Sequence, residues 1–208
     1  MKHFIWGESI IHKSKNILLE SLSIPEWSPY KIYDVMNRTD INYIQVLDTG
    51  SFATVAEHSW TVCGTRRYFG ASNSRFMGTA IPSSIGISLA NSDIPVICIF
   101  GDGGFRAYPY EIKTARTLDL PIIFIYMCDS SYSSIIQNSG DRFVKEALLL
   151  ETKEACDIVE GMGINSFRCF DTRSFKAILE SWDKTNPIFI QCIFTHKNDY
   201  QEMTFNIR

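Results

Sequence analysis

The chain has 208 residues, enough for one domain with a substantial buried core, and its hydrophobic fraction of 45% is ordinary for a globular protein. A net charge of −3 provides no basic surface, so we expect no nucleic-acid partner. No apolar run approaches the roughly 18 residues of a membrane span, and the N-terminus lacks the features of a signal peptide. We therefore expect a cytoplasmic protein without membrane association.

The predicted elements begin with a helical lead-in over residues 1–40, which contains helices at 10–22 and 30–37. From residue 41 strands and helices alternate, so we assign residues 41–208 to the main domain. The predicted strands are 44–47, 68–69, 95–100, 121–127, 166–169 and 187–194. The predicted helices are 52–60, 77–90, 108–118, 153–162 and 174–182, the last capped by Asp171 or Thr172. This alternation predicts an α/β fold, a doubly wound and mainly parallel sheet with helices on both faces.

The six cysteines include no C-x-x-C pair, and the ligand spacing that zinc or iron–sulfur sites need is missing. Cys98 and Cys192 fall within predicted strands, where they are interpreted as small buried hydrophobic residues. We expect reduced thiols rather than disulfides, in keeping with a cytoplasmic protein.

Polar residues and glycines follow two neighbouring predicted strands at the point where each strand ends. One strand runs into GDGG at 101–104, and the next ends at CDSS at 128–131. Because the carboxyl ends of parallel strands form a ligand-binding crevice, Asp102 and Asp129 can direct oxygen ligands into the same crevice. The glycine-rich turn beside them is suited to phosphate. This arrangement suits a divalent metal that bridges the protein to a diphosphate.

The spacing of 27 positions between Asp102 and Asp129 resembles the thiamine-diphosphate motif, in which GDG is followed by a similar spacer and an Asn-Asn pair. The segment DTGS at 48–51 resembles the D-x-G turn of the same family. The segment FMGTAIPSSIG at 76–86 resembles its M-G-x-x-x-P-x-x-I-G sequence. Over residues 41–200 the chain is similar to the C-terminal, diphosphate-binding domain of thiamine-diphosphate-dependent enzymes of the acetolactate synthase and 2-oxo acid decarboxylase kind.

The resemblance implies thiamine diphosphate and Mg²⁺ as cofactors and assigns roles to particular residues. The metal ligands would be the carboxylate of Asp102, a side-chain oxygen of Asp129 and the backbone carbonyl of Ser131. The full cofactor-binding set would be Gly50, Ser51, Met77, Gly101, Asp102, Gly103, Gly104, Asp129 and Ser131, with Met77 wedged between the cofactor rings. The residues alone leave alternatives open, namely a core position for Met77, a helix cap for Ser51, and a solvated loop instead of pocket lining for Tyr132 and Ser133.

Two departures from the family stand out. Cys128-Asp129 replaces the Asn-Asn pair, so Asp129 adds a negative charge beside Asp102. A like-charge contact at about 4 Å costs roughly 1–4 kcal/mol before a metal offsets it. In addition, enzymes of this family use a pyrimidine-binding domain to supply the activating glutamate, and residues 1–40 are too few to form one.

We therefore expect no catalytic residue in this chain and a separate pyrimidine-binding chain as its partner. A heterotetramer would follow, and the Met1 start favours a separate subunit. The expected enzyme is a lyase or transferase that decarboxylates a 2-oxo acid, with acetolactate synthase-like carboligation left open. The alternative is a degenerate, non-catalytic subunit with a regulatory or scaffolding role. A ferredoxin-linked 2-oxo acid oxidoreductase is disfavoured because the sequence has no clustered cysteines for iron–sulfur ligation. A transketolase-like enzyme is disfavoured because it fits the segment around Met77 less well.

Overall fold

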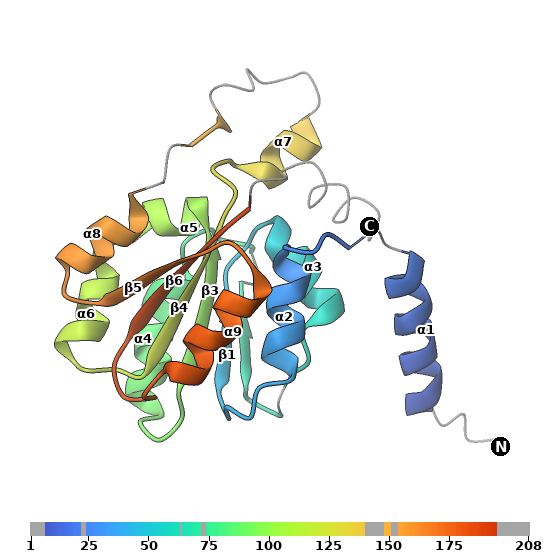
Figure 1. Cartoon of the computed structure of the whole chain (residues 1–208), viewed down its shortest axis with the longest axis horizontal. Helices are drawn as coiled ribbons and strands as arrows, with labels where there is room; N and C mark the ends of the chain where they lie inside the picture. Colours follow the sequence, from blue (N-terminus) through green and yellow to red (C-terminus); the bar gives the residue numbers. More distant parts are fainter. Residues whose placement is uncertain are drawn as a thin grey trace.

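The computed structural model describes residues 7–21, 24–62, 64–71, 74–139, 148–150 and 154–194. Six strands form one sheet in the spatial order β2-β1-β3-β4-β6-β5, and every neighbouring pair is parallel (Figure 1). The strands are β1 (Ile44–Leu47), β2 (Tyr68–Gly70), β3 (Val96–Gly101), β4 (Ile122–Cys128), β5 (Asn165–Cys169) and β6 (Ile188–Ile193). The predicted α/β fold with a parallel sheet is confirmed.

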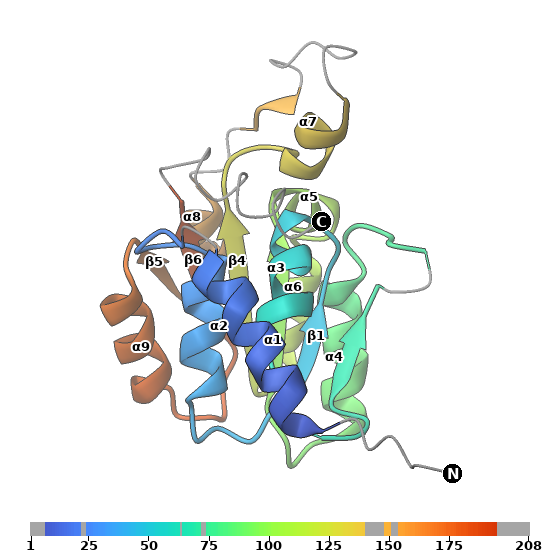
Figure 2. The same ribbon diagram turned by 90° about the vertical axis from the view of Figure 1, so that its right-hand side faces the viewer.

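Helices cover both faces of the sheet. One face carries α2 (Pro29–Asn37), α3 (Ser51–Ser59) and α9 (Thr172–Ser181). The other carries α4 (Ala80–Ala90), α5 (Asp102–Ala107), α6 (Glu111–Thr117) and α8 (Ala155–Gly161). The short helix α7 (Ser133–Ser139) lies beyond the carboxyl end of β4, above the sheet in Figures 1 and 2.

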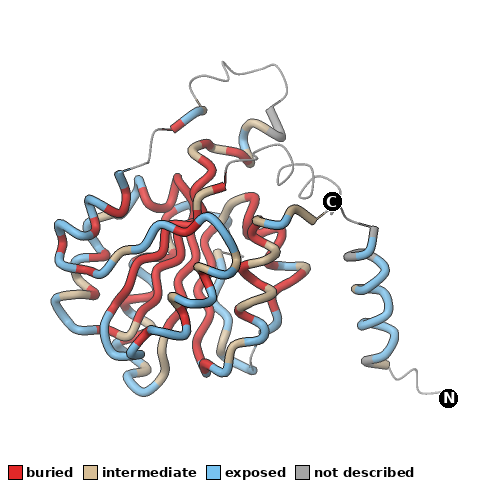
Figure 3. Tube along the Cα trace, in the orientation of Figure 1, coloured by how far each residue is buried: buried red, intermediate tan, exposed pale blue. Residues whose placement is uncertain are grey.

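The core divides into two layers because alternate residues of a strand point to opposite faces. Ile97 and Ile99 of β3 pack toward α2, α3 and α9, whereas Cys98 and Phe100 pack toward the opposite helices. β3 and β4 are buried along their whole length, as expected for central strands of a parallel sheet, and they form the buried centre of Figure 3. Cys98 and Cys192 are fully buried free thiols, as predicted.

The predicted strands are all present, and each end lies within one residue of its expected position. Two helices begin three residues later than predicted. α4 starts at Ala80 because Gly78 adopts φ +88°, which an α-helix does not allow. α6 starts at Glu111, because a turn at residues 108–110 separates it from α5. The predicted cap of α9 is Asp171, whose carboxylate accepts a hydrogen bond from the backbone N–H of Ser174 at 2.8 Å.

The two helices of the predicted lead-in have different surroundings. α2 belongs to the core, since Ile32, Tyr33 and Met36 are almost completely buried against α3 and α9. α1 (Glu8–Ser21) stands to one side of the sheet in Figure 1, and its described isoleucines are exposed. The domain boundary at residue 40 stays a prediction. Within the described residues, no helix is both long enough and apolar enough to cross a membrane.

The order of the strands locates a crevice. From β1 the chain moves outward to β2 and then crosses back to β3 on the other side of β1. The connections that leave β1 and β3 therefore run in opposite directions along the sheet, which leaves a crevice between the carboxyl ends of these two strands. Ligands of open α/β sheets bind in such a crevice. Gly50, Asp102 and Asp129 follow the carboxyl ends of β1, β3 and β4.

Candidate cofactor and metal site

A cleft with a volume of about 340 Å³ opens at the carboxyl ends of β1, β3 and β4. Of the nine residues predicted to bind the cofactor, eight line this cleft: Gly50, Ser51, Met77, Gly101, Asp102, Gly103, Asp129 and Ser131. Gly104, the ninth, packs beneath it against Asp48. The structure therefore brings segments that are far apart in the sequence to one place, although their contacts with a cofactor stay predictions.

Asp102 holds the loop after β4 in place. It is the first residue of α5 and is only 3% exposed. Its Oδ2 accepts hydrogen bonds from the backbone N–H groups of Asp129 at 3.0 Å and Ser130 at 3.2 Å. Its Oδ1 accepts a hydrogen bond from the hydroxyl of Tyr126 at 2.6 Å. The carboxylate thus links the tips of two adjacent strands.

Asp129 is the second buried carboxylate of the cleft, with 5% of its surface exposed. Its Oδ1 accepts hydrogen bonds from the backbone N–H of Ser131 at 3.1 Å and from the Ser131 hydroxyl at 2.9 Å. Its Oδ2 accepts a hydrogen bond from the hydroxyl of Ser133. Burial and the nearby charge of Asp102 nevertheless raise the pKa of Asp129 from its ordinary value of 3.8 to about 6.

This donor set fits Mg²⁺. Two buried carboxylates lie together, and none of the described groups that shift the pKa of Asp129 carries a positive charge. Ser131 and Leu149 form an isolated antiparallel β-bridge. Its two hydrogen bonds run from the N–H of Leu150 to the carbonyl of Ser130 and from the N–H of Tyr132 to the carbonyl of Leu148. The Ser131 carbonyl takes no part in that bridge. Mg²⁺ favours a few protein oxygens completed by phosphate and water, so Asp102, Asp129 and Ser131 could hold it.

The glycine-rich turn leaves room for Met77. A Cβ atom at Gly103 would lie 2.0 Å from the Sδ of Met77 and 3.0 Å from Cε1 of Tyr132. Met77 is 46% exposed and lines the cleft, so it does not occupy the core position that the sequence left open. Its predicted place between the cofactor rings is consistent with this location and stays a prediction.

Asp48 is a buried acid that sequence reasoning did not include among the site residues. Its carboxylate accepts hydrogen bonds from the backbone N–H of Gly78 at 2.8 and 3.0 Å and from that of Thr49 at 2.9 Å. A Cβ atom at Gly104 would lie 2.3 Å from its Oδ2. Burial raises the pKa of Asp48 to about 6 despite these donors. Asp48 therefore positions the loop that carries Met77, a role that the D-x-G resemblance could have suggested.

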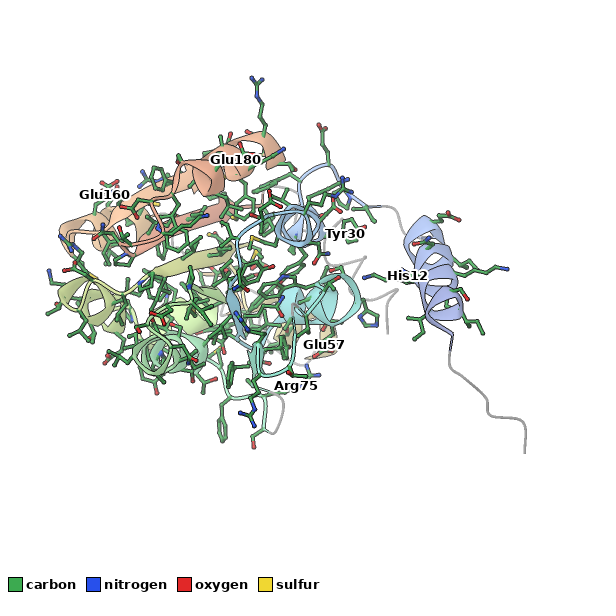
Figure 4. The ribbon with its side chains drawn as sticks, turned by 90° about the horizontal axis from the view of Figure 1, so that it is seen from below. His12, Tyr30, Glu57, Arg75, Glu160 and Glu180 are labelled. Carbon is green, nitrogen blue, oxygen red and sulfur yellow. The ribbon has the colours of Figure 1, made fainter. Side chains whose placement is uncertain are left out.

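The remaining predicted residues surround the cleft. Ser51 is buried as the first residue of α3, whose cap is Gly50, and its hydroxyl lies 3.0 Å from that of Ser134 on α7. Tyr132 and Ser133 line the cleft and do not belong to a solvated loop. Among the described lining residues, Arg75 is the one basic side chain. It forms an exposed ion pair with Glu57 at 3.1 Å, and both residues are labelled in Figure 4.

Comparison with known proteins agrees with this geometry. A family model described as the thiamine pyrophosphate enzyme, C-terminal TPP binding domain, matches residues 48–192. The chain belongs to this family. The match extends from Asp48 at the first strand tip to Cys192 in β6 and therefore includes every residue assigned to the cleft.

Several relatives of this family member are acetolactate synthases. The enzyme of Bacillus subtilis (strain 168) is 27% identical over 135 residues, covering 62% of this chain and 24% of the relative. Acetolactate synthase 3, chloroplastic, of Brassica napus is 34% identical over 80 residues, covering 38% of this chain and 12% of the relative. The chloroplastic enzyme of Arabidopsis thaliana is 28% identical over 123 residues, covering 59% of this chain and 18% of the relative. The matched part thus spans about a quarter or less of each relative.

A solved structure shares the fold. The X-ray structure of a chain from Mycobacterium smegmatis, described as a thiamin diphosphate-dependent enzyme, superimposes with a TM-score of 0.69 at 21% identity. The superposition covers 80% of this chain and 32% of that chain. At this identity the likeness supports the α/β fold of the domain and nothing finer.

Proposed function

We propose that the chain binds thiamine diphosphate and Mg²⁺ and forms the diphosphate side of the active site of an enzyme that decarboxylates a 2-oxo acid. One observation carries this proposal: the buried carboxylates of Asp102 and Asp129 lie together at neighbouring strand tips, beside a cleft lined by glycines and Met77. An all-oxygen site next to a glycine-rich turn is the chemistry that a metal-bridged diphosphate needs.

The residues of this chain would bind and orient rather than react. Asp102, Asp129 and the Ser131 carbonyl would hold the metal, and Met77, which lines the cleft beside Gly103, would contact the cofactor rings. When bound, thiamine diphosphate supplies the nucleophilic carbon and the electron sink for decarboxylation. Family membership and the acetolactate synthase relatives support an enzyme of this type, and carboligation to an acceptor is part of the proposal.

The activating glutamate would come from a pyrimidine-binding domain on another chain. The segment that matches the Bacillus subtilis relative spans 24% of that enzyme. We propose a complex of two copies of each chain, with the substrate bound where the two kinds of chain meet. Native mass spectrometry of the complex purified from its source tests this assembly, and a homo-oligomer without a second chain would contradict it.

Cofactor binding is tested by calorimetry with the full chain, titrated with thiamine diphosphate in the presence of Mg²⁺. The informative variant is Asp102→Ala, which we expect to abolish binding. A matched control is Asp171→Ala, the same change at the exposed cap of α9, which should leave binding unchanged. Equal binding by both variants would contradict the assignment of Asp102.

The second candidate function is a non-catalytic subunit that keeps the fold for regulation or scaffolding. The observation that favours it is the negative charge of Asp129 where the family motif has asparagine, because this charge lies beside Asp102 and would repel a diphosphate bound in the cleft. A complex that contains the partner chain but takes up neither thiamine diphosphate nor Mg²⁺ would support this candidate over the enzyme.

A further inference from the structure

A buried hydroxyl lies directly beneath the proposed metal site. Tyr126 is a residue of β4, three positions before Asp129, and its side chain has no exposed surface. Its hydroxyl donates a hydrogen bond of 2.6 Å to Oδ1 of Asp102. Hydrogen bonds from a buried neutral donor to a carboxylate at this distance are among the stronger ones in proteins.

The ring of Tyr126 is held by its neighbours. It stacks on Phe105 with a centroid distance of 5.1 Å and on Phe100 with 5.8 Å. Phe189 packs at 6.0 Å from the same ring. The backbone of Tyr126 is paired with Phe100 on one side and Gln191 on the other. The hydroxyl therefore has little freedom to follow Asp102 if the carboxylate rotates.

The other oxygen of Asp102 is held equally well. Oδ2 accepts the two backbone N–H groups of Asp129 and Ser130, while Oδ1 accepts the Tyr126 hydroxyl. A weaker contact joins Oδ1 to the thiol of Cys128 at 3.9 Å, and Gln191 donates to that thiol at 3.5 Å. Donors on both oxygens fix the plane of the carboxylate and therefore the direction of the second lone pair of Oδ1, the oxygen that accepts one O–H group rather than two N–H groups.

We propose that Tyr126 is a positioning residue that orients the carboxylate of Asp102 for metal binding. The inference rests on the proposed function, because it requires Asp102 to be a Mg²⁺ ligand. Groups that hydrogen-bond a metal ligand typically change metal affinity by about 10- to 100-fold when removed. Mg²⁺ demands near-ideal octahedral geometry, whereas Ca²⁺ accepts irregular coordination. Loss of the hydroxyl should therefore weaken Mg²⁺ binding more than Ca²⁺ binding.

The test is Tyr126→Phe, which removes the hydroxyl and keeps the ring that packs on Phe105. Its matched control is Tyr43→Phe, since Tyr43 is also buried and its hydroxyl donates to the carbonyl of Met36 at 3.1 Å. Tyr43 precedes β1 and so lies at the opposite end of the sheet from the cleft. Mg²⁺ and Ca²⁺ are each titrated calorimetrically into the full chain with thiamine diphosphate present.

We expect Tyr126→Phe to bind Mg²⁺ about 10- to 100-fold more weakly than the unaltered chain, with a smaller loss for Ca²⁺. Tyr43→Phe should bind both ions as the unaltered chain does. Because both ions are measured on one preparation, partial unfolding would lower both affinities in parallel and leave their ratio unchanged. Unchanged Mg²⁺ affinity, or an unchanged ratio, overturns the role of Tyr126 and leaves the proposed function intact. An unaltered chain that binds no Mg²⁺ overturns the proposed function and this inference with it.

Discussion

Replacing Asp48 with asparagine should remove a pH-dependent loss of stability. Asp48 is 2% exposed, and burial raises its pKa from the ordinary value of 3.8 to about 6. Asparagine has nearly the same shape, does not ionise, and can still accept a hydrogen bond from the N–H of Gly78. The substitution therefore removes the buried charge while keeping one bond to the loop that carries Met77.

The expected size follows from the two pKa values. A folded pKa of about 6 means that the native chain binds this proton more tightly than the unfolded chain. The stability that protonated Asp48 contributes is therefore complete below pH 3.8 and is lost as the pH rises through 6. At about 1.4 kcal/mol for each pKa unit, the whole loss is about 3 kcal/mol. Roughly 2 kcal/mol of it falls between pH 4.5 and pH 7.5.

The assay is urea unfolding of both proteins at several pH values in the presence of a metal chelator. Other titrating groups, including Asp129, are common to both proteins, so their effects cancel when the two free energies of unfolding are subtracted. The stability of Asp48→Asn relative to the unaltered chain should rise by roughly 2 kcal/mol between pH 4.5 and pH 7.5. A difference that stays constant to within about 0.5 kcal/mol would refute the argument that burial of Asp48 carries this cost.

Two further predictions concern the cleft. Gly103→Ala should weaken thiamine-diphosphate binding about tenfold in calorimetry, because the added Cβ would displace Met77. The control is Gly86→Ala, where an added Cβ meets no atom within 4 Å. It should leave binding unchanged and raise the free energy of unfolding by about 0.5–1 kcal/mol. Equal binding by both would refute the role of the glycine. Asp129→Asn should retain or tighten binding whereas Asp102→Ala abolishes it, and equal affinities of these two variants and the unaltered chain would contradict the metal site.

The sequence predicted the central strands well because they are short apolar runs with clear ends. β3 and β4 are buried on both faces, so apolar and aromatic residues fill them, and each run stops at a glycine or a polar residue. The beginning of α4 was harder to predict. Its true start depends on the φ of +88° at Gly78, and that conformation is set by Asp48, which lies 30 positions earlier in the chain.

The site was predictable as a set of strand tips but not as a hydrogen-bond network. Gly-Asp-Gly and Asp129 can be recognised in sequence because both follow apolar strands. Tyr126 has no such mark, since a tyrosine inside a buried strand looks like any other aromatic residue. Its contact with Asp102 depends on the register that places Phe100 beside Tyr126 and on the turn that brings the carboxylate back over that pair.

The charge at Asp129 separates the two candidate functions without requiring the substrate or the partner chain. Without a cation, burial and the charge of Asp102 both disfavour the ionised form of Asp129, so keeping two carboxylates together costs stability at neutral pH. A divalent cation between them would reverse that cost, because a ligand that binds only the folded chain stabilises it by mass action. If the chain binds a metal, adding Mg²⁺ at neutral pH must raise the free energy of unfolding of the unaltered chain and raise it much less for Asp102→Ala. If the chain is a scaffold, Mg²⁺ must leave the free energies of unfolding of both proteins unchanged. The two buried carboxylates then lower the stability of the chain, and no ligand offsets that loss.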